Sequence, residues 1–211
     1  MGRTSDARER LVQATIDLIW RTSYGAVSVD AICEKAGVKK GSFCHFFASK
    51  DELVVAALDT HWESRRAALD GIFSPSVQPL DRLRRYFAHV YEMQTAVKEE
   101  YGRILGCFHN SVGTECIQQE PAIAAKVQEV LSTYRRYIET TLRDAQAAGV
   151  MRKGDPAADA KTLFAYVEGA LGQARIHDDA EILRRLPEAG FAILGITTAG
   201  AAPTRRTSAR A

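Results

Sequence analysis

A cysteine and a histidine stand side by side at positions 44 and 45, and these residue types supply nucleophiles, proton acceptors and metal ligands. The surrounding residues favour a helix, in which neighbouring side chains point about 100° apart. Cys44 and His45 therefore do not face each other, and no other cysteine or histidine lies within a turn. The spacing of the four cysteines and five histidines matches no zinc pattern. We expect no catalytic residue, metal site or cofactor, with Cys44 a small semi-buried residue and His45 a polar contact.

Three lysines near this pair indicate a different chemistry, a surface that binds something acidic: Lys39, Lys40 and Lys50. Residues 1–50 contain eight Lys/Arg and five Asp/Glu, a balance of +3, whereas the remaining residues sum to −1. This excess fits a small basic face on the N-terminal part better than a globally basic protein. Lysine can donate to phosphate or to guanine, which makes DNA the first acidic partner to consider.

The elements that position these residues are predicted to be helices almost throughout. Apolar residues recur three and four positions apart in several long segments, and no segment shows sustained alternation with β-branched residues. We predict an all-α chain with a capping box at Ser49 and Glu52. Its parts are an N-terminal three-helix helix-turn-helix domain (1–48), a linking helix (49–72), a C-terminal helical bundle (73–198) and a disordered tail (199–211).

Residues 28–47 predict two short helices joined by a tight turn. Ser28 is placed as the N-cap of the first helix, and Gly37 allows a left-handed turn without Cβ strain. Phe43 and Phe46 share the buried side of the second helix. In such a helix-turn-helix, the second helix can lie in the major groove and present N-terminal side chains to base edges. The side chains placed there are Lys39, Lys40 and Ser42.

The stretch "SVDAICEKAGVKKGSFCHFFASKDEL" (28–53) resembles the signature of the TetR/AcrR family of bacterial transcriptional regulators. The turn glycine, the aromatic second helix and the Ser-Lys cap all stand in the register of that signature. Beyond residue 72 the resemblance is only architectural. The family pattern implies DNA contacts by residues in and around the second helix. They are Ser28, Lys39, Lys40, Ser42, Phe43, Cys44, His45 and Lys50.

Two positions depart from the family pattern. Cys33 stands where the family usually has alanine, and a small residue there keeps the packing. Cys44 stands where the family usually has a tyrosine whose hydroxyl contacts a phosphate. The resemblance therefore implies the family's binding mode without this one contact.

The family resemblance also implies that the bundle binds a small-molecule effector. Aromatic and polarisable residues are the pocket candidates, with a few polar groups to orient a ligand, and plain core packing is the alternative for each aromatic residue. The candidates are Trp62, Phe87, Tyr91, Gln94, Tyr101, Cys107, Phe108, Tyr134, Phe164 and Glu168.

A homodimer is implied in the same way. The stretch "YVEGALGQA" (166–174) is rich in small residues, which allow helices to approach closely, and it would form a seam with residues 187–196. Tight packing within one chain is the alternative. The interface candidates are Gly169, Gly172, Ala174, Phe191 and Leu194.

Gly106 and Cys107 resemble a Gly-Cys position found in family members that sense electrophiles or oxidants. A sensor cysteine needs a low pKa and exposure. Arg103 stands four residues earlier, which is one turn of a helix, and would favour the thiolate. Two interpretations stay open, a thiol-based sensor and a buried structural thiol.

Together with the helix-turn-helix pattern, the family resemblance thus implies a ligand-responsive repressor released from a palindromic operator by a small-molecule effector, which would tilt the linking helix. The competing hypotheses are a partner-binding bundle without DNA binding and an all-α enzyme, although no converging nucleophile, base and stabiliser is found. No apolar run approaches the roughly 18 residues of a membrane span, and no signal-peptide pattern opens the chain. Four cysteines are too few for a disulfide scaffold. We therefore expect a cytoplasmic protein with reduced thiols.

Overall fold

The computed structural model describes residues 2–196, and within this range the chain contains α-helices and no β-strand. The helices are α1 (Gly2–Arg21), α2 (Val29–Ala36), α3 (Lys40–Phe46), α4 (Lys50–Ile72), α5 (Pro79–Tyr101), α6 (Phe108–Cys116), α7 (Pro121–Ala147), α8 (Pro156–His177), α9 (Glu181–Arg184) and α10 (Leu186–Ile193). The predicted all-α class is confirmed. The tail predicted at 199–211 lies outside the described residues. None of the described helices is both long and apolar enough to cross a membrane.

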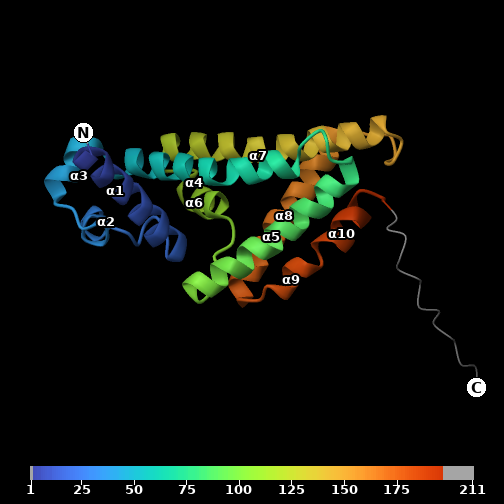
Figure 1. Ribbon diagram of the computed structural model, residues 1–211. Helices are drawn as coiled ribbons and strands as arrows, with labels where there is room; N and C mark the ends of the chain where they lie inside the picture. The colour runs from blue at the N-terminus through green and yellow to red at the C-terminus, as the bar shows by residue number, and fades with distance from the viewer. Residues whose placement is uncertain (1, 197–211) are drawn as a thin grey trace, which may run out of the picture.

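Helices α1 to α3 form a head at one end of an elongated molecule (Figure 1). Helix α4 leaves the head and runs alongside α7 toward the opposite end. Helices α5 to α10 form the bundle, and within it α6 contacts α1 of the head. Because α4 contacts α1, α5 and α7, it links the head to the bundle along most of its length.

The turn between α2 and α3 has the predicted local geometry. The Ser28 side chain caps α2 by accepting from the Ala31 N–H at 3.1 Å. Gly37 has φ 63°, in the left-handed region that glycine adopts without Cβ strain. The Val38 N–H then donates to the Cys33 carbonyl at 3.0 Å, which closes the end of α2. These contacts set the angle at which α3 leaves α2.

Helix α4 begins at a capping box, as predicted, with one difference. The Ser49 hydroxyl accepts from the Glu52 N–H at 3.1 Å. The Glu52 carboxylate reaches back to the N–H of Ala48, at 2.7 Å, rather than to that of Ser49. The first contact satisfies an N–H group that a helix start leaves unpaired, and the two contacts together fix the junction between α3 and α4.

One apolar cluster joins the head to the bundle. Leu11 and Ile32 of the head pack in the same cluster as Leu105 and Phe108, and all four are at most 1% exposed. A second cluster fills the far half of the bundle around Leu83, Ile138, Leu163 and Phe191. Since the first core is continuous, the head is packed against α6 and α7 rather than tethered to them.

The chain between α5 and α6 is not helical. Helix α5 ends at Tyr101, its C-cap residue Gly102 has φ 77°, and the backbone is irregular up to Cys107. Gly106 has φ 67°, and a Cβ there would lie 3.3 Å from the Leu171 carbonyl oxygen. Glycine is therefore required both by the backbone angle and by the close approach to α8. The expected helical turn from Arg103 to Cys107 is wrong for this reason.

Candidate DNA-binding surface and effector cavity

The exposed face of α3 carries side chains that DNA can reach. Lys39 and Lys40 are exposed at its N-terminal end, and Cys44 and His45 are exposed one turn further along. Gly41 lies between them, with open space where a Cβ would stand. Cys44 is thus exposed rather than semi-buried. The face thus carries two lysine ammonium groups and an imidazole around Gly41, which has no side chain. A DNA phosphate backbone can therefore approach it closely.

Phe43 faces the opposite way. It is 6% exposed, and its ring centre lies 6.2 Å from that of Phe47 in the core of the head. Ser42 is half-buried beside it. The assignment of Phe43 to the DNA-contacting set is therefore corrected: its buried ring holds α3 in the head and leaves no surface for DNA.

The Lys40 ammonium already has a partner within the chain. Its Nζ lies 2.8 Å from Asp30 Oδ1 of α2, and the hydrogen bond to this carboxylate raises the pKa of Lys40. Both side chains are well exposed, and exposed ion pairs contribute little stability in water. A DNA phosphate can therefore replace Asp30 as the partner of Lys40 at small cost.

Lys50 is turned away from its predicted role. Its Nζ donates to the Tyr24 carbonyl at 2.5 Å and lies 3.8 Å from the centre of the Tyr24 ring. Partial burial lowers the pKa of Lys50. The Tyr24 hydroxyl in turn donates to Asp51 Oδ1 at 2.6 Å. In this structure Lys50 anchors the α1–α2 turn to the start of α4, and its ammonium is not directed outward for a phosphate.

The same α1–α2 turn is held from the bundle side by Glu115 of α6. The Glu115 carboxylate accepts from the N–H groups of Tyr24 and Gly25, at 2.8 and 2.7 Å. The turn that positions α2 and α3 is therefore fixed by contacts to both α4 and α6.

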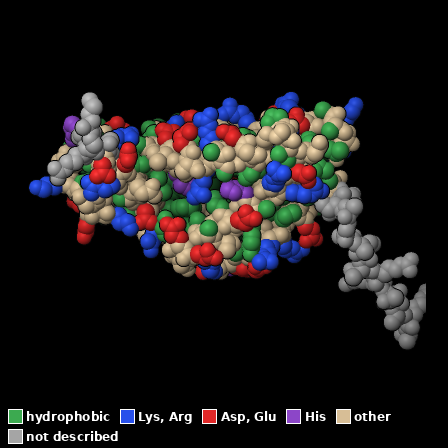
Figure 2. All heavy atoms as spheres, in the orientation of Figure 1, with side chains coloured by type: hydrophobic (Ala, Val, Ile, Leu, Met, Phe, Trp, Pro, Cys, Tyr) green, Lys and Arg blue, Asp and Glu red, His purple; other side chains and the backbone are tan. Residues whose placement is uncertain are grey.

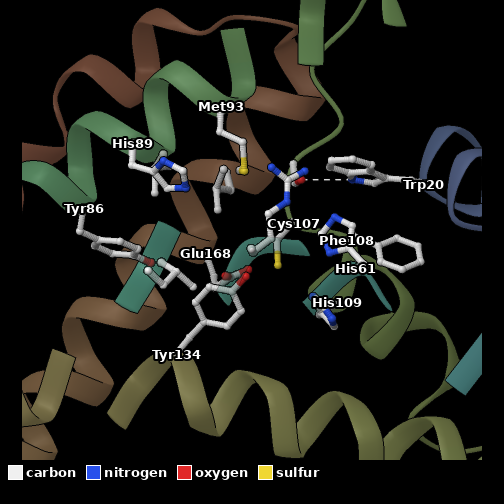
Figure 3. A pocket seen from close by; sticks show the side chains of 15 residues that line it. Trp20, His61, Tyr86, His89, Met93, Cys107, Phe108, His109, Tyr134 and Glu168 are labelled. Carbon is white, nitrogen blue, oxygen red and sulfur yellow. Dashed lines mark hydrogen bonds between the residues drawn. The ribbon is translucent and has the colours of Figure 1, made fainter. Parts of the chain in front are cut away.

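A cavity of about 50 Å³ lies where the head meets the bundle (Figure 3). Figure 2 shows a hollow at mid-length of the molecule, where hydrophobic and histidine side chains are visible. Helices α4, α5, α7 and α8 and the start of α6 supply most of its wall. The cavity is lined by Trp20, His61, Arg65, Leu69, Tyr86, His89, Val90, Met93, Gly106, Cys107, Phe108, His109, Tyr134, Glu168 and Leu171.

Trp20 brings the head into this wall. Its Nε1–H donates to the carbonyls of Leu105 and Gly106, both at 3.2 Å. Its ring meets that of His61 edge to face, with centres 5.1 Å apart. Arg175 of α8 donates to the Trp20 carbonyl at 3.1 Å. A molecule in the cavity would therefore contact α1 of the head directly.

Several of the predicted pocket residues line this cavity or support it. The residues at the wall are Cys107, Phe108, Tyr134 and Glu168. Trp62 and Phe164 stand behind Tyr134, with ring centres 5.0 and 6.2 Å from it. These two aromatic residues fix the position of the Tyr134 ring.

The remaining predicted pocket residues have other roles. Gln94 is fully buried, and its amide bonds to both the carbonyl and the N–H of Gly106, at 3.1 and 2.9 Å. Phe87 belongs to the second core cluster, and Tyr91 accepts from Arg184 outside the cavity. The Tyr101 ring centre lies 6.2 Å from that of Trp20, but Tyr101 is not among the lining residues. Of these residues, Gln94 affects the cavity, because its hydrogen bonds fix the position of Gly106 in the cavity wall.

The prediction lacks many of the lining residues, notably Trp20, His61, Arg65, Tyr86 and His89. Most of these residues could have been predicted from a sequence pattern in which polar residues recur on a helix face that is otherwise apolar. His61, Arg65 and Leu69 recur every fourth position on α4, and Tyr86, His89, Val90 and Met93 share one face of α5. Trp20 has no such signal, because only the tertiary structure brings α1 to the bundle.

Burial sets the charges around the cavity. It raises the pKa of the Glu168 carboxyl to about 7. It lowers the pKa of His109 to about 4 and that of His61 well below its usual value, and the charge of Arg65 lowers both further. At neutral pH both imidazoles are uncharged, Glu168 is partly protonated, and Arg65 supplies a full positive charge. Within residues 2–196 no cluster of three or more His, Cys, Asp or Glu side chains is arranged to hold a metal ion.

The Cys107 thiol lacks the properties of a reactive sensor. Burial and the Glu168 carboxyl raise the pKa of Cys107 well above its usual value. A sensor thiol needs a lowered pKa, and the expected help from Arg103 is absent because residues 103–107 are not helical. The surroundings favour the structural interpretation of this thiol.

Comparison with known proteins accounts for both parts of the chain. The family described as bacterial regulatory proteins, tetR family, matches residues 11–57. The family described as tetracyclin repressor-like, C-terminal domain, matches residues 79–189. The chain belongs to the TetR family. It is accordingly a DNA-binding transcriptional regulator and not an enzyme.

Relatives within the TetR family align over most of their length. The transcriptional regulator AcuR of Cereibacter sphaeroides is 32% identical over 176 residues, which cover 81% of this chain and 77% of AcuR. The repressor NemR of Escherichia coli is 24% identical over 184 residues, 84% of this chain and 88% of NemR. A crystal structure of a TetR regulatory protein from Rhodobacter sphaeroides has a TM-score of 0.78 at 28% identity, covering 89% of this chain and 98% of that one.

TetR-family regulators function as dimers, and α8 of this chain has an open face. Gly169 and Gly172 have no heavy atom within 4 Å of a built Cβ beyond their own helix. Ala165 is exposed on the same face, and Ile176 is 70% exposed. These four positions follow helical spacing, so they form one stripe, which we call the α8 stripe.

The other interface candidates lie inside the chain. Ala174, Phe191 and Leu194 are at most 1% exposed. The Phe191 ring meets Phe87 edge to face, with centres 5.9 Å apart. Their assignment to the dimer interface is corrected, because packing within one chain already covers them.

Proposed function

We propose that this TetR-family regulator is a cytoplasmic homodimeric repressor that leaves a palindromic operator when a small molecule enters the cavity. The observation that carries the proposal is the shared wall of the cavity. Trp20 belongs to the head that carries α3, and its Nε1–H donates to the Leu105 and Gly106 carbonyls at the edge of the cavity. NemR, a relative along most of the chain, is named a repressor.

The DNA-binding part of the proposal rests on α3. Its exposed N-terminal end carries Lys39 and Lys40, which can donate to phosphates or to guanine edges. Two copies of α3 in a dimer read half-sites one helical turn apart when their centres lie about 34–36 Å from each other. The operator of such a dimer is therefore a palindrome.

The regulatory part rests on contacts that would transmit a change in the cavity. Helix α4 supplies His61, Arg65 and Leu69 to the wall and continues from the head, so a ligand that displaces α4 also displaces α3. Trp20 provides a second connection, from the wall to α1. Because a few ångströms of displacement disturb contacts at both half-sites, ligand and operator oppose each other's binding. The coupling must be reciprocal.

The test is selection from a random pool of duplex DNA, followed by anisotropy titration of the enriched site at fixed salt. The proposal expects an enriched palindrome. Lys39→Ala and Lys40→Ala should each weaken binding to it or alter its sequence, whereas Lys153→Ala, in the exposed loop before α8, should leave binding unchanged. If no sequence is enriched, or if both α3 variants bind like the unmodified protein, the assignment of α3 as the DNA-reading helix is wrong.

A further inference from the structure

Three polar side chains in the cavity wall have buried atoms that lack a partner. Within the described residues, both ring nitrogens of His61, Nε of Arg65 and Oε2 of Glu168 have no hydrogen-bond partner. His61 is only 8% exposed. Leaving buried polar atoms unpaired is unfavourable, so these groups mark where a ligand's polar atoms would be stabilised.

The charge in the cavity favours an anion. No ion pair of Arg65 occurs among the described residues, although its guanidinium carbon lies 6.0 Å from the centre of the Trp20 ring. Burial is the main cause that lowers the pKa of His61, His89 and His109, and the positive charge of Arg65 lowers all three further, so Arg65 acts on this side of the cavity. A guanidinium binds a carboxylate with two parallel hydrogen bonds, a geometry that a neutral or cationic group cannot reproduce.

Glu168 does not oppose an anion below neutral pH. Burial raises the pKa of its carboxyl to about 7, so it is mainly protonated in that range and can donate a hydrogen bond. The hydrogen bond between Glu168 and the Cys107 thiol lowers the pKa of Glu168, but this effect is smaller than that of burial. A cationic ligand would require the ionised form of Glu168 and would be repelled by Arg65.

The other lining residues and the volume of the cavity limit the polarity and size of the rest of the ligand. Leu69, Val90, Met93 and Leu171 present apolar surface to the cavity. The volume of about 50 Å³ admits a short chain rather than a fused ring system. The site therefore combines one cationic end with a small apolar compartment.

We propose that the cavity binds a small aliphatic carboxylic acid as its anion, with the carboxylate on Arg65 and His61 and the alkyl chain among the apolar side chains. This inference rests on the proposed function of the cavity as the effector site. It also offers a link to the head: because the Arg65 guanidinium lies over the Trp20 ring, a carboxylate that draws the guanidinium toward itself would remove a contact from α1.

The experiment measures binding of straight-chain carboxylates, from acetate to octanoate, to the full-length protein by calorimetry at pH 6.5 and constant ionic strength. The matched amides and amines of the same chain lengths are measured in parallel. At least one acid should bind about tenfold or more tightly than its amide, the difference expected for losing a hydrogen bond to a charged group. The amines should not bind.

Two arginines on α4 provide a matched pair of variants. Arg65→Gln should weaken binding of the best acid to the level of its amide, and Arg65→Lys should retain part of the affinity because it keeps the charge. Arg66→Gln should bind like the unmodified protein, since Arg66 is exposed and pairs with Glu63 and Asp70. Circular dichroism of each variant checks that the fold is retained.

Several outcomes would overturn the carboxylate assignment. They are no binding by any acid, equal binding of acid and amide, retention of affinity in Arg65→Gln, or amine binding that Glu168→Gln abolishes. Operator binding measured on the same preparations separates this failure from that of the proposed function. A protein that binds its operator but no carboxylate is still a regulator with another ligand, whereas loss of operator selection contradicts the regulator proposal itself.

Discussion

The thiols of this chain differ in their surroundings, and the surroundings determine what each can do. Cys44 is exposed on α3, whereas Cys107 is half-buried beside Glu168, and burial of the thiol group together with the Glu168 carboxyl raises the pKa of Cys107. Substitution at Cys44 therefore changes the DNA-facing surface with little effect on the core. Cys44 and Glu168, the neighbour of Cys107, give separate tests at the scale of single residues.

Cys44→Tyr should tighten operator binding by about threefold or more. The family usually has a phosphate-contacting tyrosine here, and a hydrogen bond to a charged group contributes roughly 1.5–3 kcal/mol before ordering costs. The exposed position leaves room for the ring. Anisotropy titration at fixed salt measures the change, and Cys44→Ser is the control, because its short hydroxyl should leave affinity near that of the unmodified protein. Weaker binding by Cys44→Tyr would show that the surface differs from the family's.

Glu168 should make stability fall as pH rises through the mildly acidic range. Its pKa is raised from 4.5 to about 7 by burial, so between these values the folded state holds a proton that the unfolded state has lost. Since the unfolded state then binds fewer protons, the free energy of unfolding decreases with pH, by roughly 3 kcal/mol at most, and levels off above pH 7.

The measurement compares urea unfolding of the unmodified protein and Glu168→Gln at a series of pH values from 4.5 to 8. Glutamine does not titrate, so the variant should lack this component and gain relative stability at the upper end. Glu34→Gln, at an exposed carboxyl on α2, serves as the control. Parallel stability curves for the unmodified protein and Glu168→Gln would contradict the assigned pKa.

At the scale of elements, the α1–α2 turn of the head is bonded to both α4 and α6. Lys50 and Asp51 hold it from α4, and Glu115 holds it from α6. These contacts are polar and lie near the surface, so they can open without disrupting either core. We infer that the turn is a point where movement of α6 reaches the head.

Glu115→Ala should increase amide hydrogen exchange at Tyr24 and Gly25 by about tenfold, because it removes a charged acceptor from both N–H groups. Exchange in α7 should not change. Glu129→Ala, an exposed glutamate on α7, is the control and should leave the turn protected. If the turn stays equally protected in Glu115→Ala, α6 does not restrain it through this carboxylate.

At the scale of the whole molecule, the head lies at one end and the α8 stripe lies on the bundle, so one chain supplies one DNA-reading surface (Figure 1). Binding both halves of a palindrome then requires a second chain. The free space at Gly169 and Gly172 allows a partner helix to approach closely. Dimerisation and operator affinity should therefore be lost together.

Gly172→Leu should weaken the dimer by filling the space between partner helices. The chain itself should not be destabilised, since no atom outside α8 lies within 4 Å of the new Cβ and leucine favours a helix by about 1 kcal/mol over glycine. Light scattering measures the mass of the assembly, and anisotropy measures operator affinity. The affinity should fall because a monomer binds only one half-site at a time. Gly71→Leu, at another open glycine on α4, is the control. An unchanged dimer in Gly172→Leu would place the interface elsewhere.

The amino-acid sequence by itself determined the local structure of the head. Ser28, Gly37 and the Ser49–Glu52 pair act over a few residues, so their capping and turn geometry follows from residue type and spacing. Apolar periodicity determined the all-α class for the same reason. The exposed lysines at the start of α3 also follow, because a two-helix motif places them there.

Only the tertiary structure decided which side chains meet at the cavity and which are free. Trp20 reaches Leu105 and Gly106, which are 85 and 86 residues away along the chain, a contact that no local pattern encodes. Lys50 is turned to Tyr24, and Phe191 and Leu194 are covered by their own chain, although their residue types suit a phosphate contact and an interface. The physical reason is that burial and partner choice depend on how distant helices pack, and burial in turn sets the pKa values that give the cavity its charge.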